Sequence, residues 1–224
     1  MTAMDRLQDV ILERFQHRPA GIDKLDRLWD AAVLIPLVQT EEGICVLFEK
    51  RAQSLRRQPG EVCFPGGRFE CGDAGFDTTA VRETCEELGL DPGDISLCAE
   101  LDVLVTHNGP IIHPFVGVIE DISQISLNPD EVECVFTVPL KSLLEQVPAR
   151  GSTLLADHPG DDFPFHLVPQ KQRGWRMNKK YYVYFYRYNE HIIWGLTARM
   201  LFAFLHRARK ELTDFLADPG DDCD

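Results

Sequence analysis

The 224-residue chain lacks any stretch approaching the roughly eighteen consecutive apolar residues expected of a membrane-spanning helix. It also lacks Cys-x-x-Cys pairs, and its seven scattered cysteines favour reduced thiols over a disulfide framework or a zinc site. Charged residues interrupt the N-terminal segment every few positions, unlike a secretory signal peptide, and the C-terminal DPGDDCD does not resemble a peroxisomal address. We therefore expect a cytoplasmic protein that does not contact membranes.

Positive charge is also scarce in this chain. There are 23 Lys and Arg residues against 36 Asp and Glu residues, which gives a net charge of −13. This balance argues against nucleic acid or an anionic membrane as a general partner. An anionic small-molecule substrate would therefore have to meet a local basic patch or a bound metal ion. The sequence is compatible with either a monomer or a homodimer.

The length allows one substantial hydrophobic core, and no internal repeat or low-complexity linker divides the chain. We expect a single domain over residues 1–224, with its core at about 29–150. An N-terminal helical extension covers 1–28, and a C-terminal extension of strand and helix covers 151–224. Within residues 4–17, the helical spacing predicts a helix packed on the main body through Leu7, Val10, Ile11 and Phe15.

Apolar, β-branched and aromatic runs between turn residues predict most of the strands. We expect strands at 31–38, 43–51, 97–105, 111–119, 132–140, 181–188 and 191–195. Periodicity and stop signals predict helices at 76–88, 141–147 and 197–216. The first of these helices should have Asp77 or Thr78 near its N-cap and should end at Gly89. Residues 150–180 are rich in Pro, Gly and charges, so we expect them to be irregular.

Three glutamates crowd one face of the predicted 76–88 helix. At about 100° per residue, Glu83, Glu86 and Glu87 share an arc of about 100°, separate from the apolar arc around Ala80. Like charges at this spacing destabilise a helix by roughly 0.2–0.5 kcal/mol per pair. The cluster is therefore either a solvated acidic face or the site of a hard divalent cation such as Mg²⁺, which takes oxygen ligands.

The residues around this cluster resemble the signature of the Nudix hydrolases. That signature is a Gly, five residues, an acidic residue, a spacer and then R-E-U-x-E-E-x-G-U, where U is apolar. Gly67, Asp73 and the run RETCEELGL from Arg82 to Leu90 fit this signature. Asp73 stands in place of the usual Glu, and eight residues rather than seven separate it from Arg82.

A second pattern leads directly into the first and resembles the coenzyme A subfamily of Nudix hydrolases. The subfamily pattern is L-L-T-x-R-[SA]-x3-R-x3-G-x3-F-P-G-G, and this chain reads LFEKRAQSLRRQPGEVCFPGG. Nine positions match at fixed spacing, namely Leu47, Arg51, Ala52, Arg56, Gly60, Phe64, Pro65, Gly66 and Gly67. Phe48 and Glu49 stand where the pattern has Leu and Thr.

The resemblance implies an α+β fold, an α/β/α sandwich in which a mixed sheet lies between helices, with helical extensions at both ends. It also implies a site that holds Mg²⁺ or Mn²⁺ while water cleaves a diphosphate. Glu83 and Glu87 would be the principal metal ligands. Glu86 would be a third ligand or hold a metal-bound water, and the Gly66 carbonyl would complete the set. Arg82 would orient these carboxylates through bidentate bonds.

The resemblance leaves the general base open. Glu131 or Glu133, beyond the signature, would take this role, unless both residues simply flank a strand. Glu70 and Asp73 are candidates for further contacts around the metal.

The substrate contacts are open as well. Arg51 and Arg56 would contact phosphate oxygens, together with Gly66 and Gly67, although Arg51 has the alternative of pairing with a structural carboxylate. A second basic cluster would either bind the 3′-phosphate and adenine of coenzyme A or form a solvated turn. It surrounds Trp175 and consists of Lys171, Arg173, Arg176, Lys179 and Lys180.

These patterns together predict a metal-dependent pyrophosphatase. The substrate would be coenzyme A or acyl-CoA, and the products 3′,5′-ADP and 4′-phosphopantetheine or its acyl form. One alternative is hydrolysis of another nucleoside diphosphate compound, such as ADP-ribose or a dinucleotide. A different class is a catalytically silent module that senses such a ligand, although a sensor has no need to keep three mutually repelling glutamates.

Overall fold

The computed structural model describes residues 2–17, 22, 29–107, 109–169 and 174–217. The helices are α1 (Ala3–Phe15), α2 (Phe76–Leu88), α3 (Leu140–Glu145), α4 (Gly195–Arg207) and α5 (Arg209–Ala217), with short 3₁₀ helices η1 (Pro92–Asp94) and η2 (Ile122–Gln124). The strands are β1 (Asp30–Thr40), β2 (Gly43–Arg51), β3 (Val62–Cys63), β4 (Gly66–Arg68), β5 (Ile95–Glu100), β6 (Leu104–Val105), β7 (Ile111–Ile119), β8 (Val132–Pro139), β9 (Ala149–Asp157), β10 (Arg176–Tyr188) and β11 (His191–Trp194). None of the helices in the described ranges has the length and apolar character needed to span a bilayer.

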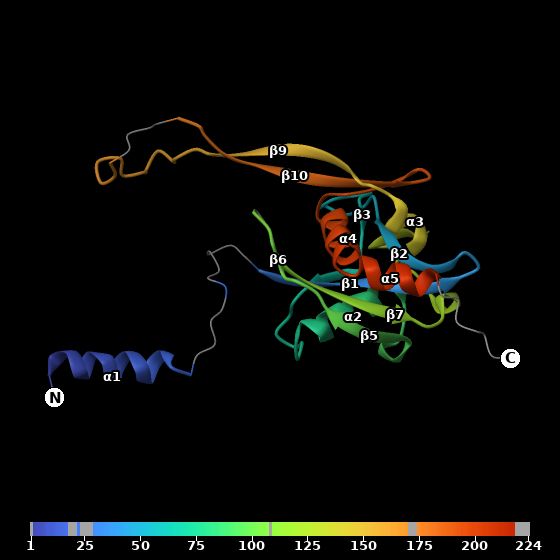
Figure 1. Cartoon of the computed structure of the whole chain (residues 1–224), viewed down its shortest axis with the longest axis horizontal. Helices are drawn as coiled ribbons and strands as arrows, with labels where there is room; N and C mark the ends of the chain where they lie inside the picture. The colour runs from blue at the N-terminus through green and yellow to red at the C-terminus, as the bar shows by residue number, and fades with distance from the viewer. Residues whose placement is uncertain (1, 18–21, 23–28, 108, 170–173, 218–224) are drawn as a thin grey trace.

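A mixed sheet forms the centre of the molecule (Figure 1). Within the described residues it has eight strands, in the order β3-β2-β1-β7-β5, with β4 and β8 added beside β1 and β2 and with β6 beside β7. Strand β1 is antiparallel to β2 and parallel to β7. The β1–β2 hairpin follows from two apolar runs joined by a tight turn at Gly43, whose φ of 94° suits glycine. The predicted strands at 31–38, 43–51 and 111–119 are confirmed.

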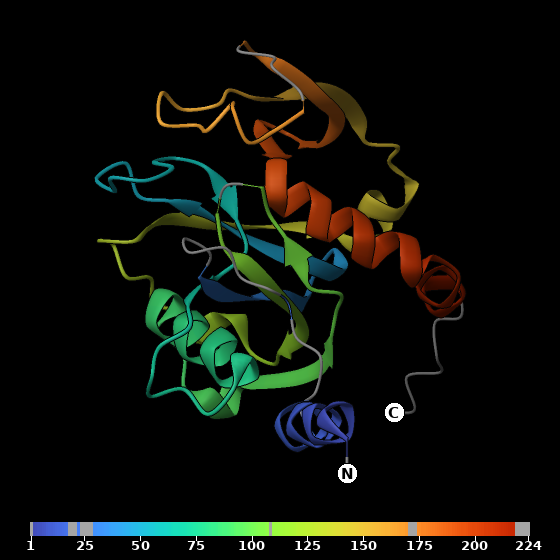
Figure 2. The same cartoon turned by 90° about the vertical axis from the view of Figure 1, so that its left-hand side faces the viewer.

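Helices cover both faces of the sheet, which confirms the predicted α/β/α sandwich (Figure 2). Helix α2 packs on one face over a core cluster that contains Cys45, Leu47 and Leu88. Helix α4 packs over the other face, in a cluster that contains Phe48 and Leu201. Successive residues of β2 thus serve different cores, because side chains alternate between the two faces of a strand.

Helix α2 lies between two glycines. Gly75 is its N-cap, and Asp77 and Thr78 follow in the first turn, near the cap as predicted; Asp77 accepts a hydrogen bond from the N–H of Thr78 at 2.8 Å. The predicted stop at Gly89 is confirmed, because this residue is left-handed with a φ of 66°. A Cβ there would lie 2.2 Å from the Ser126 carbonyl oxygen, so a larger residue has neither the conformation nor the space.

The predicted irregular structure of residues 150–180 is confirmed at 158–169 and 174–175 and is wrong on either side, where strands form. Strands β9, β10 and β11 form a second antiparallel sheet, and β9 and the start of β10 lie in this range. They build a long hairpin that extends away from the main body (Figure 1). Most of β9 is exposed, so the strand carries no alternation of buried and exposed residues that a sequence pattern would reveal. The predicted strands at 181–188 and 191–195 are confirmed as β10 and β11.

Two predicted elements are each divided in the structure. The helix expected at 197–216 is α4 followed by α5, and the break lies at Ala208. The guanidinium of Arg209 donates to the Leu144 carbonyl at 2.7 Å, which ties the start of α5 to α3. The strand expected at 97–105 is β5 and β6, because the pairing of β5 with β7 is irregular and does not continue into β6. Strand β8 and helix α3 confirm the strand and helix expected at 132–140 and 141–147.

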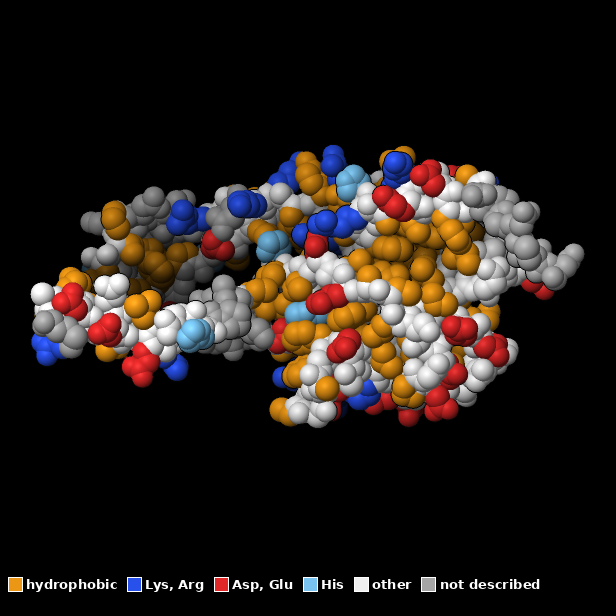
Figure 3. Space-filling model, turned by 60° about the horizontal axis from the view of Figure 1, so that its bottom comes forward, with side chains coloured by type: hydrophobic (Ala, Val, Ile, Leu, Met, Phe, Trp, Pro, Cys, Tyr) orange, Lys and Arg blue, Asp and Glu red, His pale blue; other side chains and the backbone are white. Residues whose placement is uncertain are grey.

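The N-terminal helix α1 does not pack on the main body as predicted. Leu7, Val10 and Ile11 are 52%, 62% and 49% exposed, and the side chain of Phe15, the fourth residue of the prediction, lies outside the described part of the chain. The helix is specified locally instead, because Thr2 and Asp5 form a capping box at its start. Figure 3 shows hydrophobic atoms on the surface of both α1 and the β9–β10 hairpin.

Candidate active site

Contacts with the sheet set the position of α2, which carries the glutamate cluster. Strand β4 pairs antiparallel with β1, and α2 packs across both of these strands. At the start of the helix, the Phe76 ring stacks on buried His113 of β7, with ring centroids 3.5 Å apart. The Nε2 atom of His113 lies 3.2 Å from Oδ1 of Asp30 on β1. The glutamates therefore face a fixed loop at β4.

Glu87 is held by the backbone of this loop. Its side chain is almost fully buried, with the residue 4% exposed, and its Oε2 accepts a hydrogen bond from the Gly66 N–H at 2.8 Å. Gly66 has a φ of 148°, and a Cβ there would lie 2.4 Å from the Ala32 carbonyl oxygen. Only glycine lets the loop pass between β1 and Glu87. Gly66 thus contacts Glu87 through its N–H group, and the metal-binding role of its carbonyl stays a prediction.

Glu83 lies directly against the backbone at Gly67. A Cβ on residue 67 would lie 2.3 Å from Cδ of Glu83, so the glycine makes room for this carboxylate. On its other side, Oε1 of Glu83 lies 3.0 Å from Nη2 of Arg82. Burial is the largest influence on Glu83 and raises the pKa of its carboxyl despite the neighbouring Arg82.

Arg82 connects the loop to the glutamates. Its Nε and Nη2 donate to the two oxygens of Asp73 at 2.9 and 3.2 Å, and its Nη2 also donates to the Arg68 carbonyl at 3.1 Å. Its Nη1 lies 3.3 Å from Oε2 of Glu86, whose side chain is 56% exposed. The bidentate pair of bonds is thus made to Asp73, whereas Glu83 and Glu86 are each contacted by one nitrogen of Arg82. The role of Arg82 in orienting the glutamates stays a prediction.

Asp73 is occupied by this network. Besides Arg82, it accepts a hydrogen bond from Oγ1 of Thr79 at 2.8 Å and one from the Glu70 N–H at 3.0 Å. The hydrogen bonds from Arg82 are the largest influence and hold the pKa of Asp73 well below its usual range. The shorter Asp side chain, which replaces the usual Glu, therefore anchors both Arg82 and the first turn of α2.

A fourth carboxylate, Glu49, lies beside this cluster and was not predicted from the sequence. It is completely buried on β2, and its Oε1 accepts a hydrogen bond from Sγ of Cys63 at 3.0 Å. Burial is the largest cause of a raised pKa at both Glu49 and Glu87, and the charge of Glu131 raises both further. The charge of Glu49 also raises the pKa of Glu87. The alternation of side chains along β2 was a sequence signal for Glu49, because it puts this carboxylate on the same face as the apolar residues Cys45 and Leu47.

The two candidates for the general base have different positions. The charge of Glu131 acts on Glu49, Glu83 and Glu87 and raises the pKa of each, which places Glu131 near the cluster. The Glu131 carbonyl also accepts a hydrogen bond from the Ala52 N–H at 2.8 Å. The assignment of a catalytic role to Glu131 stays a prediction.

Glu133, by contrast, is engaged elsewhere. Its carboxylate pairs with Nζ of Lys50 at 2.6 Å and accepts a hydrogen bond from Gln53 at 3.0 Å. These contacts lower the pKa of Glu133, chiefly through the hydrogen bond from Lys50. Lys50 follows Glu49 on β2 and therefore points to the opposite face of the sheet. The structure thus separates Glu133 from the other glutamates.

The predicted substrate-binding arginines lie before the glycine loop. Arg51 is on the same face of β2 as Glu49, and its Nε is buried with no hydrogen-bond partner among the described residues. Arg56 is exposed on the loop that connects β2 to β3. The second basic cluster lies on the β9–β10 hairpin, where Trp175, Arg176, Lys179 and Lys180 are exposed; Lys171 and Arg173 lie outside the described residues.

The donor set of the cluster suits a hard divalent cation. Glu83, Glu87 and Glu49 offer carboxylate oxygens in a shielded position, and Oε2 of Glu49 is a buried atom with no hydrogen-bond partner among the described residues. Within the described ranges, no three acidic, His or Cys side chains are already arranged around one point. Cation binding would therefore require these carboxylates to leave their present partners, the Gly66 N–H and Arg82.

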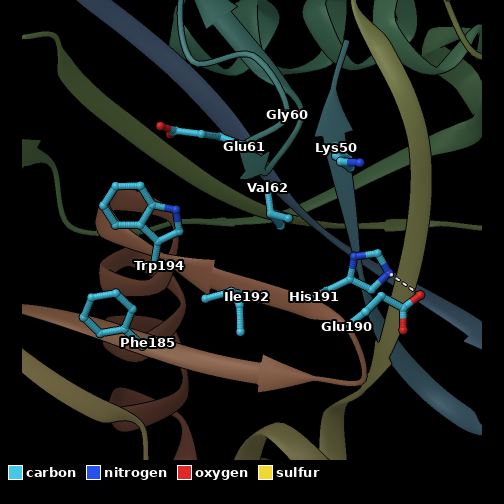
Figure 4. Close-up of a pocket in the computed structure, with 9 residues that line it drawn as sticks. All are labelled: Lys50, Gly60, Glu61, Val62, Phe185, Glu190, His191, Ile192 and Trp194. Atoms are coloured by element: carbon cyan, nitrogen blue, oxygen red, sulfur yellow. Dashed lines mark ion pairs between the residues drawn. The ribbon is translucent and has the colours of Figure 1, made fainter. Parts of the chain in front are cut away.

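A hollow of about 560 Å³ lies on the other side of β2 (Figure 4). Lys50, Val62, His191, Ile192 and Trp194 are among the residues that line it. Because Lys50 and Glu49 point to opposite faces of the strand, this hollow is distinct from the carboxylate cluster.

Comparison with known proteins agrees with this geometry. The family model of the NUDIX domain matches residues 28–158, which is more than half of the chain. The chain therefore belongs to the Nudix family.

Individual relatives are also similar to this chain. It is 39% identical to the peroxisomal coenzyme A diphosphatase NUDT7 of Mus musculus, over 62% of this chain and 58% of the mouse protein. It is 32% identical to the mitochondrial Nudix hydrolase 15 of Arabidopsis thaliana, over 76% of this chain and 55% of the plant protein. The matches thus span little more than half the length of these two relatives. An uncharacterized Nudix hydrolase, NudL of an Enterobacter species, is 32% identical over 90% of this chain and 94% of its own length.

Replacing Gly67 by Ala should remove activity with little loss of stability. The added Cβ meets the flexible end of Glu83, which can move away from the site at small energetic cost. The hydrolysis rate of Gly67→Ala measures its activity, and its thermal unfolding temperature measures its stability.

The neighbouring variant Gly66→Ala is the matched comparison. There the Cβ meets the backbone of β1, so this variant should be destabilised by about 1–3 kcal/mol or more. Normal activity in Gly67→Ala would contradict the position assigned to Glu83.

Without metal, the protein should become less stable as the pH rises from about 5 to about 9. The pKa values of Glu49 and Glu87 are raised above 4.5 in the folded chain, so their stabilising contribution is complete below pH 4.5 and is lost as the pH approaches the folded values. Thermal unfolding with a chelator at successive pH values measures this slope. Glu87→Gln should flatten it, and a Tm that rises over the same range would contradict the assignment.

Proposed function

We propose that this protein is a metal-dependent pyrophosphatase that hydrolyses the diphosphate of coenzyme A or acyl-CoA. The products are 3′,5′-ADP and 4′-phosphopantetheine or its acyl form. One observation carries this proposal: the segment with the coenzyme A pattern ends at Gly66 and Gly67, the two residues that contact Glu87 and Glu83. The pattern that points to the substrate and the carboxylates that point to the chemistry therefore form one structural unit.

The identity of the mouse relative supports the choice of substrate. That protein is named a coenzyme A diphosphatase, and it is 39% identical to this chain. Two other relatives carry only the general name Nudix hydrolase, so their names do not indicate a substrate.

In the proposed reaction, water attacks one phosphorus of the diphosphate, the P–O–P bond breaks, and two phosphomonoesters leave. Glu83 and Glu87 would hold Mg²⁺ or Mn²⁺, with Glu86 and the Gly66 carbonyl as further ligands. When bound, the metal neutralises charge on the diphosphate and lowers the pKa of water. Arg82 keeps Glu83 and Glu86 in place through the contacts described above.

The remaining residues act on the water and the substrate. Glu131 accepts the proton of the attacking water, a role that fits its position near Glu83 and Glu87. Arg51 and Arg56 bind phosphate oxygens of the substrate and thereby supply local positive charge in a chain with a net charge of −13. The cytoplasmic location and the monomeric or dimeric state stay predictions.

The substrate proposal is tested by incubating the full chain with coenzyme A and Mg²⁺ or Mn²⁺. We expect release of 3′,5′-ADP, detected by chromatography, and much slower turnover of dephospho-CoA, ADP-ribose and dinucleotides. Comparable turnover of these compounds would overturn the coenzyme A assignment in favour of a broader Nudix hydrolase. Binding without turnover of any of them would indicate a sensing module.

Replacing Glu87 by Gln should lower kcat at least about 100-fold and preserve the fold. The change removes a charge from the proposed metal site, and stabilisation by a metal is worth several kcal/mol, where each 1.36 kcal/mol is tenfold in rate. Steady-state kinetics and circular dichroism measure activity and fold.

Glu133→Gln is the matched control for this variant. Glu133 pairs with Lys50 away from the cluster, so its replacement should leave kcat nearly unchanged. A near-normal rate for Glu87→Gln would refute the ligand assignment.

A further inference from the structure

Glu49 lies beside the carboxylate cluster, although neither sequence pattern has an acidic residue at its position. The coenzyme A pattern has Thr at this position, and the Nudix signature begins only at Gly67. In the structure, Glu49 lies on the face of β2 that is turned toward α2, where its neighbours Cys45 and Leu47 belong to the core under that helix. A carboxylate that interrupts such an apolar row is unfavourable unless it has a specific partner.

The two oxygens of Glu49 have different surroundings. Oε1 accepts a hydrogen bond from Sγ of Cys63 on the paired strand β3, at 3.0 Å. Oε2 is fully buried and has no hydrogen-bond partner among the described residues. Glu49 as a whole is 0% exposed, so water at the surface does not replace the missing partner. The Cys63 contact therefore fixes the orientation of the carboxylate without satisfying it.

The neighbouring groups show what kind of partner is missing. Burial is the largest cause that raises the pKa values of Glu49 and Glu87, and the charge of Glu131 raises both further. The charge of Glu49 also raises the pKa of Glu87, whereas contacts with Cys63, Arg51 and Glu87 lower the pKa of Glu49. Burial of several carboxylates together costs free energy, and a divalent cation reverses the sign of that interaction. A hydrogen-bond donor alone would satisfy Oε2 but leave the repulsion with Glu87.

We propose that Glu49 is a further cation-binding residue, whose unpartnered Oε2 joins the carboxylates of Glu83 and Glu87 around a divalent metal ion. Cys63 holds the other oxygen and so positions the carboxylate for this contact. The proposal rests on the metal-dependent function proposed above and extends it. With Glu in place of Thr, this chain has a more negative site that binds its cation more tightly.

The test is to measure Mn²⁺ binding by titration calorimetry, without substrate, for the full chain and for Glu49→Gln. Gln has nearly the same shape but no charge, and we expect its affinity for Mn²⁺ to be about 10–100-fold lower. Thermal unfolding with a chelator should show that metal-free Glu49→Gln is at least as stable as the original protein, because a buried repulsion is removed. An unchanged Mn²⁺ affinity would overturn the proposal, and so would an original protein that does not bind Mn²⁺.

Two further variants make the result specific. Glu133→Gln removes a carboxylate from the neighbouring strand β8 that pairs with Lys50, and it should leave Mn²⁺ affinity unchanged. Glu49→Thr introduces the residue of the coenzyme A pattern and should weaken Mn²⁺ binding in the same way as Gln, even if Gln does not fold. A loss of metal-free stability with unchanged Mn²⁺ affinity would assign Glu49 a structural role instead.

The outcome is independent of the substrate. If coenzyme A is not hydrolysed but Glu49→Gln weakens Mn²⁺ binding, the cation-binding role stands and only the substrate assignment fails. If coenzyme A is hydrolysed and Mn²⁺ affinity is the same in both proteins, the role of Glu49 fails and the proposed function stands.

Discussion

The close packing of two carboxylates against a pair of glycines is the constraint on which this site depends. Glu87 reaches the N–H of Gly66, and Glu83 occupies the space that a side chain at Gly67 would fill. These contacts need α2 to lie directly on β4, and that position depends in turn on the stacking of Phe76 on His113 at the start of the helix. The fold therefore concentrates negative charge beside this loop, at the site proposed to bind a cation and a diphosphate.

Local signals in the sequence were enough to predict the central part of the fold. The apolar runs of β1 and β2, the helical periodicity of α2 and its stop at Gly89 each have a physical cause within a few residues. The failures occur where distant contacts or exposure decide. The exposed β9–β10 hairpin has no burial pattern to read, α1 lacks the predicted contact with the body, and the break at Ala208 accompanies a hydrogen bond from Arg209 to α3.

The candidate site likewise has features that the sequence could predict and features that depend on tertiary contacts. Spacing alone placed Glu83 and Glu87 on one helix face, and the resemblance to the Nudix signature named them and Arg82 as site residues. The separation of Glu131 from Glu133 could not be predicted in this way, since it follows from the pairing of β8 with β2 and from the ion pair of Glu133 with Lys50. Glu49 was overlooked because its place beside the glutamates of α2 depends on the tertiary packing of β2 against that helix. Alternation along β2 already placed it on the same face as Cys45 and Leu47.

The most direct measurement of the central claim is anomalous diffraction from a crystal of the full chain soaked in Mn²⁺. The account predicts an anomalous peak bounded by the carboxylates of Glu83, Glu87 and Glu49, next to the Gly66–Gly67 loop. A peak elsewhere, or the absence of a peak at a Mn²⁺ concentration that supports hydrolysis, would contradict it.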